Sequence, residues 1–232
     1  MKKYRLSIAG VWIEDVAGGI LDLDGTCIES SKASAGDSAK DKIKRRLQGY
    51  VVSPDKMPLD YGIKMALTSG FAKKPLINNS GDFVTRAYHE DFPIALTTNC
   101  PGKFLEHYRV SRDMDVRVFF HRFFGDGKIW GDDDDIFKIV HGEMVDPDRR
   151  KPHPDLILEA CDQIKINPDD AAGFEDSLEG LLALDSAGVG TIVCMYNENI
   201  SDAEWDEIEK FKKRTDINFG IIGSFDDVQF ET

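Results

Sequence analysis

Short apolar runs that alternate with amphipathic segments recur along this chain, and they constrain its fold more than any other feature. Five such runs cover residues 17–21, 93–97, 171–174, 190–195 and 219–222. Apolar runs without polar alternation are typical of strands in a parallel sheet that is covered on both faces. Three of the runs end directly before polar side chains, namely Asp22, Thr98 and Glu175.

The segments between the runs have helical periodicity and helix-end signals. Pro154 stands at the expected first turn of a helix that reaches about residue 164, and Gly188 suits the end of a helix that begins near residue 178. Ser201 and Glu204 form a capping box ahead of a third apolar stripe. Strands that alternate with helices predict an α/β fold with a Rossmann-like parallel sheet flanked by helices.

Two stretches interrupt this alternation. Residues 31–85 contain two helical segments, at 41–47 and 59–67, separated by Gly, Pro and Ser, and they show no convincing strand. We therefore predict a small inserted helical cap at 31–85, with residues 1–30 and 86–232 forming the α/β core. Residues 125–150 are rich in Gly and Asp, and we expect a long loop there with at most short elements.

Charge and cysteine content narrow the functional classes. The chain has 42 acidic and 29 basic residues, a formal net charge of −13, which argues against a nucleic-acid-binding surface. No apolar run approaches the roughly 20 residues that a membrane-spanning helix needs. The four cysteines lie far apart without a CxxC pair, a spacing that favours reduced thiols in a cytoplasmic protein over disulfides or a zinc site.

The segment Asp22-Leu23-Asp24-Gly25-Thr26 carries the clearest chemical signal. Two carboxylates that are two residues apart and directly follow a buried strand can supply a nucleophile and an acid/base partner. The polar residues that follow the other strands lie at the carboxyl edge of the same predicted sheet, which is where ligands bind in open parallel sheets. We therefore expect these side chains to converge on one site.

Four segments in chain order resemble the motifs of the haloacid dehalogenase-like (HAD) hydrolases, in the branch that contains phosphatases and phosphoglucomutases. The segments are Gly19–Thr26, Ile94–Asn99, Lys151–Asp155 and Gly173–Gly180. The resemblance spans roughly residues 17–230, and it implies a HAD-like core with a cap between the first and second motifs.

The resemblance also implies a role for each motif residue. Asp22 is the implied nucleophile, Asp24 the acid/base residue and Lys151 the cation of the site. Thr98 and Asn99, with the backbone N–H groups that follow, are the implied substrate-binding residues. The cofactor is Mg²⁺, with Asp22, Asp24, Asp176 and Glu175 as its implied ligands. Whether Glu175 binds the metal directly or supports the residues that do is left open.

The function that follows is hydrolysis of a small phosphorylated metabolite through an aspartyl-phosphate. Asp24 favours a phosphate ester over a halide, because a departing halide needs no proton. A mutase similar to β-phosphoglucomutase shares all four motifs and is one alternative. A non-catalytic interaction protein on the same scaffold is another, since fold alone does not guarantee activity. Asp176 also has a purely structural alternative, as the N-cap of the helix that follows it.

Overall fold

The computed structural model describes residues 2–28, 76–100, 137–196, 200–214 and 217–231. Most of the predicted cap, including both of its predicted helices, lies outside the described residues, so the division into core and cap stays a prediction. Helix α3 (Ser80–His89) crosses the predicted boundary at residue 85. Its residues Phe83, Val84 and Ala87 are buried in the hydrophobic core.

A parallel sheet forms the centre of the described structure, as the apolar runs predict. Its strand order is β5-β4-β3-β6-β7-β8. The strands are β3 (Gly18–Asp22), β4 (Ile94–Thr98), β5 (Phe137–His141), β6 (Ala171–Glu175), β7 (Thr191–Met195) and β8 (Asn218–Ile222). The stretch 125–150, where we expected a long loop with at most short elements, contains the unpredicted five-residue strand β5, which pairs with β4 at the edge of the sheet. Residues 125–136 of that segment lie outside the described part.

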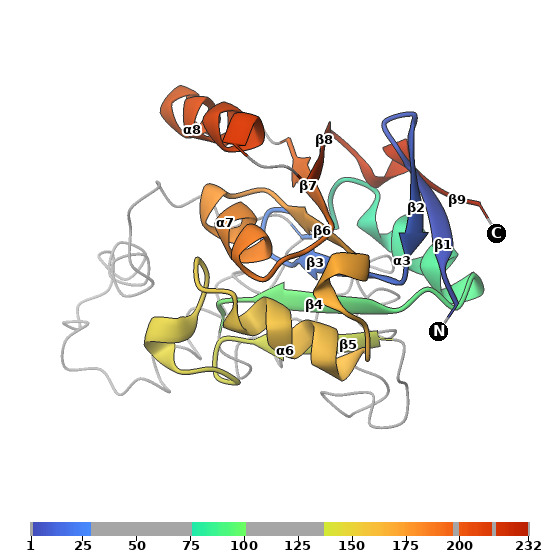
Figure 1. The fold of residues 1–232 in the computed structure, drawn as a ribbon, viewed down its shortest axis with the longest axis horizontal. Coiled ribbons are helices and arrows are strands. Elements are labelled where there is room, and N and C mark those ends of the chain that lie inside the picture. Colours follow the sequence, from blue (N-terminus) through green and yellow to red (C-terminus); the bar gives the residue numbers. More distant parts are fainter. Residues whose placement is uncertain (1, 29–75, 101–136, 197–199, 215–216, 232) are drawn as a thin grey trace, which may run out of the picture.

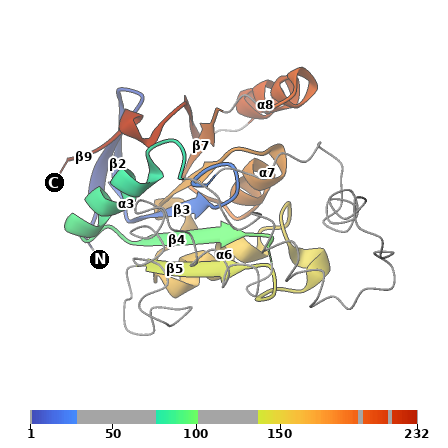
Figure 2. The same ribbon diagram turned by 180° about the vertical axis from the view of Figure 1, so that it is seen from behind.

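Three helices cover one face of this sheet (Figure 1). They are α6 (Asp155–Gln163), α7 (Leu178–Ser186) and α8 (Asp202–Arg214), and all three agree with the sequence prediction. Helix α3 lies on the opposite face, as the view from behind shows (Figure 2). Short 3-10 helices occupy Pro147–Arg149, Pro168–Asp170 and Phe225–Asp227. None of these described helices has the length and apolarity needed to cross a bilayer.

A second, antiparallel sheet joins the two ends of the chain (Figure 1). It consists of β1 (Tyr4–Ile8), β2 (Val11–Val16) and β9 (Val228–Glu231), in the order β2-β1-β9. Ala9 and Gly10 connect β1 to β2, and both have positive φ angles, as in the mirror-image turns that suit hairpins. The segment before the first predicted strand is therefore a folded part of the core.

Aromatic rings fill the space between this small sheet, α3 and the parallel sheet. Phe83 of α3 stacks on Phe225 and Phe230, with ring centroids 4.6 and 5.6 Å apart. Tyr4 meets Phe92 edge-on at 5.0 Å. Large buried rings contribute much of the apolar area of a core, so these contacts fasten the ends of the chain to the sheet that carries the site.

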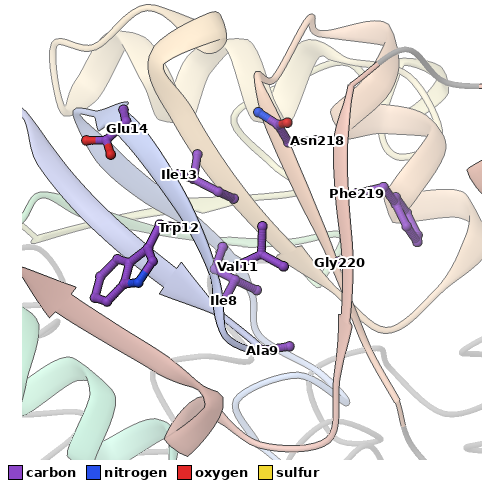
Figure 3. Close-up of a pocket in the computed structure, with 9 residues that line it drawn as sticks. All are labelled: Ile8, Ala9, Val11, Trp12, Ile13, Glu14, Asn218, Phe219 and Gly220. Atoms are coloured by element: carbon purple, nitrogen blue, oxygen red, sulfur yellow. The ribbon is translucent and has the colours of Figure 1, made fainter.

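A surface cavity of about 440 Å³ lies where the β1–β2 hairpin approaches the edge strand β8. Ile8 and Val11 lie between the hairpin and Gly220 of β8, while Phe219 points away from the hairpin (Figure 3). The lining is mostly apolar and shares no residue with the predicted site.

Candidate active site

The polar residues of three adjacent strands meet at the carboxyl edge of the parallel sheet. Asp22 is the last residue of β3, Thr98 the last of β4 and Glu175 the last of β6. Because β3 pairs in parallel with both β4 and β6, these three strand ends lie next to one another. The structure thus brings together side chains that are up to 153 positions apart in the chain.

Lys151 is the buried cation of this edge. Its Nζ lies 2.7 Å from Asp22 Oδ1 and 2.7 Å from Glu175 Oε1, and its side chain is only 4% exposed. Burial alone would lower the pKa of Lys151, but the two carboxylates outweigh it and the pKa is raised. The lysine therefore stays charged at every pH at which the protein would work.

Three carboxylates crowd around this single cation. Asp22, Glu175 and Asp176 can each direct one oxygen so that all three lie within 4.8 Å of one another. Burial, and next the charge of Glu175, raise the pKa of Asp22 well above its ordinary value, because one shared ammonium does not neutralise three carboxylates. The same two causes raise the pKa of Asp176 to about 7.

The second aspartate of the first motif is held by the end of β4. Thr98 Oγ1 donates a hydrogen bond to Asp24 Oδ2 at 3.1 Å and accepts one from the Cys100 N–H at 3.0 Å. A threonine hydroxyl can donate and accept at once, so it links the carboxylate to the backbone of the next turn. Asp24 is thereby fixed beside the strand ends.

Gly25 allows the chain to turn sharply away from β3. Its φ angle is +103°, in a region that L side chains rarely adopt, and a Cβ atom there would overlap the carboxylate of Asp176. Thr26 Oγ1 lies 3.4 Å from Asp176 Oδ1 on the other side of that turn. The turn after β3 therefore packs directly against the acidic cluster.

Sequence reasoning missed the role of Ser177. Its N–H and its Oγ both donate to Glu175 Oε2, at 3.0 and 2.9 Å, while the same Oγ accepts from the Gly180 N–H at 3.2 Å. Ser177 is thus the N-cap of α7, and Asp176 is not. The signal was present, because serine is a preferred N-cap residue and stands one position before the apolar helix.

Asn99 has different partners from those the sequence predicts. Its side-chain Oδ1 accepts from the Lys151 N–H at 3.1 Å, and its Nδ2 donates to the Lys151 carbonyl at 3.3 Å. The carboxamide therefore binds the backbone of Lys151. Its assignment as a substrate-binding side chain stays a prediction without support from this geometry.

Comparison with solved structures identifies the fold. The CbbY protein from Rhodobacter sphaeroides in complex with phosphate is 19% identical, and the match covers 90% of this chain and 95% of that one with a TM-score of 0.58. A variant of CbbY in complex with xylulose 1,5-bisphosphate gives a TM-score of 0.59 at 18% identity, with the same coverage. A putative β-phosphoglucomutase from Thermotoga maritima gives a TM-score of 0.55 at 16% identity, over 89% and 94% of the two chains.

These likenesses confirm the HAD-like fold that the four motifs predict. A HAD family hydrolase from Deinococcus radiodurans with bound phosphate and sodium matches similarly, with a TM-score of 0.57 at 16% identity over 90% and 92% of the two chains. No family model matches the sequence. No curated protein matches it either.

Proposed function

We propose that this chain, which has the HAD-like fold, is a magnesium-dependent phosphatase of small phosphate monoesters. One observation carries the proposal: a buried lysine and three buried or half-buried carboxylates gather at the carboxyl ends of β3 and β6, beside the Asp24–Thr98 pair. This arrangement offers a nucleophile, a proton carrier and positive charge within one small space. CbbY and the Deinococcus hydrolase both have structures with bound phosphate, which supports phosphate as the group recognised.

The acidic cluster fits a divalent hard cation. In their ionised forms Asp22, Glu175 and Asp176 set three negative charges against the one positive charge of Lys151, a net charge of −2 among these four groups. Oxygen ligands of this kind are those that Mg²⁺ prefers. We assign Asp22 and Asp176 as its carboxylate ligands, with the backbone carbonyl of Asp24 as a third. When bound, Mg²⁺ would screen the repulsion between the carboxylates and an incoming phosphate.

Glu175 has a supporting role in this proposal. Both of its oxygens already have partners, Lys151 at Oε1 and Ser177 at Oε2. It therefore orients the lysine, and Asp22 and Asp176 are left as the direct ligands.

The first half of the reaction transfers the phosphoryl group to the protein. A carboxylate oxygen of Asp22 attacks phosphorus, and the bond between phosphorus and the ester oxygen breaks. Asp24 gives its proton to that departing oxygen, so the product leaves as a neutral alcohol. Lys151 and the Thr98 hydroxyl stabilise the negative charge on the phosphoryl oxygens.

The second half releases phosphate. Asp24, now ionised, takes a proton from a water molecule that attacks the phosphorus of the aspartyl-phosphate. The bond between phosphorus and the Asp22 oxygen breaks, which regenerates the Asp22 carboxylate and a protonated Asp24. Before the substrate binds, the single proton of the Thr98 hydroxyl goes to Asp24 Oδ2 at 3.1 Å, and during the reaction that hydroxyl turns to a phosphoryl oxygen.

A sugar-phosphate mutase is the second candidate. The Thermotoga structure that shares the fold is described as a putative β-phosphoglucomutase, and the same aspartates would serve that reaction. A mutase keeps the phosphoryl group on the sugar, whereas a phosphatase transfers it to water. We also propose that the protein works in the cytoplasm, since its four cysteines lie far apart in the sequence without a CxxC pair, a spacing that favours reduced thiols.

A panel of phosphate monoesters tests the proposal. The purified protein should release inorganic phosphate from at least one sugar, polyol or nucleoside phosphate with Mg²⁺, and excess chelator should stop the release. Conversion of a sugar 1-phosphate to its 6-phosphate without free phosphate would support the mutase instead. Absence of both activities across the panel would favour the non-catalytic interaction protein.

A further inference from the structure

We infer that Asn99 is a positioning residue that ties the turn after β4 to the backbone of Lys151. Through this tie, Asn99 fixes where the lysine enters the site. The inference rests on the proposed function, which makes Lys151 the cation that stabilises the phosphoryl oxygens.

The contact between Asn99 and Lys151 is reciprocal. The carboxamide oxygen accepts from the Lys151 N–H at 3.1 Å, and the carboxamide nitrogen donates to the Lys151 carbonyl at 3.3 Å. Two hydrogen bonds to one residue resemble a bridge between strands, and they fix both the distance and the orientation of the two segments. A single hydrogen bond would leave the lysine backbone free to rotate about it.

The lysine needs this second anchor because its side chain is long. At its tip, Nζ is held between Asp22 and Glu175, and the whole residue is 7% exposed. Four rotatable bonds separate this tip from the backbone. Ion pairs at one end and a backbone clamp at the other leave the ammonium a single position.

The turn that carries Asn99 is also fastened to the end of β5. The Gly142 N–H donates to the Cys100 carbonyl at 3.1 Å, and the Gly142 carbonyl accepts from Arg150 Nε at 2.6 Å. Gly142 lies so close to the Asn99 carbonyl oxygen that a Cβ atom would overlap it. The turn that carries Asn99 is therefore itself fixed in place. Because of this, the two hydrogen bonds from Asn99 also fix the position of the Lys151 backbone.

The same turn begins with Thr98, which holds Asp24. Asn99 thus sets the spacing between the two groups that the proposed function directs at the phosphoryl oxygens, the Thr98 hydroxyl and the Lys151 ammonium. Misplacement of a catalytic group by about 1 Å can cost about 100-fold in rate. The predicted effect of losing the clamp is therefore on turnover more than on substrate affinity.

A double-mutant cycle separates positioning from substrate contact. Asn99→Ala should lower kcat about 10- to 100-fold and change KM less than about threefold. In a Lys151→Met background, Asn99→Ala should lower kcat by less than about twofold more, because its effect passes through the lysine. An equal loss in both backgrounds, or a loss confined to KM, would overturn the inference. Asn167→Ala is the matched control, since that carboxamide binds the half-buried Asp170 side chain outside the site.

Amide hydrogen exchange provides a readout that needs no activity. Exchange at the Lys151 N–H should be at least about tenfold faster in Asn99→Ala than in the wild type, which corresponds to the loss of roughly one hydrogen bond. The rate in Asn167→Ala should match the wild type. Unchanged exchange in Asn99→Ala would overturn the clamp. A wild-type protein that hydrolyses no phosphate ester would instead refute the proposed function, while the exchange result would still decide whether the clamp exists.

Discussion

At the scale of single residues, Asp22 and Asp24 differ in their surroundings although only one residue separates them. Asp22 pairs with Lys151 inside the acidic cluster, whereas Asp24 accepts a hydrogen bond from Thr98. A buried ion-paired carboxylate suits a nucleophile whose position must not vary. A carboxylate held by a neutral hydroxyl suits a group that exchanges protons. The two aspartates should therefore fail in different ways when they are replaced.

Asp22→Asn should abolish turnover without unfolding the protein. An amide cannot form the acyl-phosphate, so we expect a loss of at least about 10⁴-fold in kcat with an aryl phosphate. The melting temperature should stay the same or rise, because burial makes the charge of Asp22 unfavourable and Lys151 keeps Glu175 as a partner. Asp170→Asn, which removes a surface carboxylate paired with Lys3, is the control. Near wild-type turnover in Asp22→Asn would end the phosphoaspartate mechanism.

Asp24→Asn should give a loss that depends on the leaving group. The nucleophile remains, but the departing oxygen loses its proton donor, and such a loss typically costs 10²–10⁴-fold. An aryl phosphate needs little protonation as it leaves, so its hydrolysis should fall less than that of an alkyl phosphate. Measuring kcat for both substrate types, with Mg²⁺ affinity determined separately, checks this. Equal losses for both substrates would indicate that Asp24 has a structural role.

At the scale of elements, helix α7 begins at the site, while α8 begins away from it. Both start with a serine whose Oγ accepts from a backbone N–H three residues later, Ser177 for α7 and Ser201 for α8. Only Ser177 also donates to Glu175. A comparison of the two serines therefore separates the effect of a lost N-cap from the effect of a lost contact to Glu175.

Ser201→Ala should lose stability alone, whereas Ser177→Ala should lose at least as much stability and also activity. Each loses an N-cap, which typically costs about 1 kcal/mol of unfolding free energy. Ser177→Ala should in addition lower kcat by about tenfold, as expected when a partner behind a site residue is removed. Urea unfolding and steady-state kinetics of the two variants measure both effects. Equal activity in the two variants would show that the Oγ contact does not position Glu175.

The sequence predicted strands with uninterrupted apolar runs better than strands that contain charged residues. Five strands of the parallel sheet were recognisable from their short apolar runs; β3, β4, β6 and β7 are buried throughout, whereas the edge strand β8 is only partly buried. Strand β5 was missed because it is an edge strand that contains Lys138 and follows an acidic stretch. Strand β2 was missed because most of its residues are exposed, and Glu14 and Asp15 interrupt its apolar pattern.

Local sequence patterns could not predict which distant segments of the chain pair with one another. Strand β1 pairs with β9 across more than 200 positions, so neither strand carries a local sign of the other. The same holds within the site. The strand ends predicted that Asp22, Thr98 and Glu175 converge, but the clamp between Asn99 and Lys151 depends on how two loops pack together, which no residue pattern encodes.

At the scale of the whole molecule, elements packed on both faces of the parallel sheet hold the site in place. Helices α6 and α7 pack on one face and begin four residues after Lys151 and three residues after Glu175, respectively. The aromatic cluster on the other face joins the chain ends to α3. The rigid frame that results holds the carboxylates close together even though their charges repel one another. The energetic cost of that repulsion should appear in the pH dependence of the whole protein's stability.

Metal-free protein should lose part of its stability as the pH rises from about 4 to 7. The folded pKa of Asp176 is about 7, above the ordinary 3.8, so its contribution to the free energy of unfolding is fully present below about pH 4 and is lost as the pH rises through 7.

Mg²⁺ should reverse this trend because it binds the ionised carboxylates. At pH 8 a 100-fold excess over the dissociation constant adds about 2.7 kcal/mol, or roughly 5–10 °C in melting temperature for a protein of this size. At pH 5, which lies below that pKa, most Asp176 carboxyl groups are protonated, and the shift should be much smaller. Burial lowers the pKa of His141, which opposes the trend, so Asp176→Asn, which retains that histidine, is the reference. A magnesium shift of equal size at pH 5 and pH 8 would remove Asp176 from the metal site.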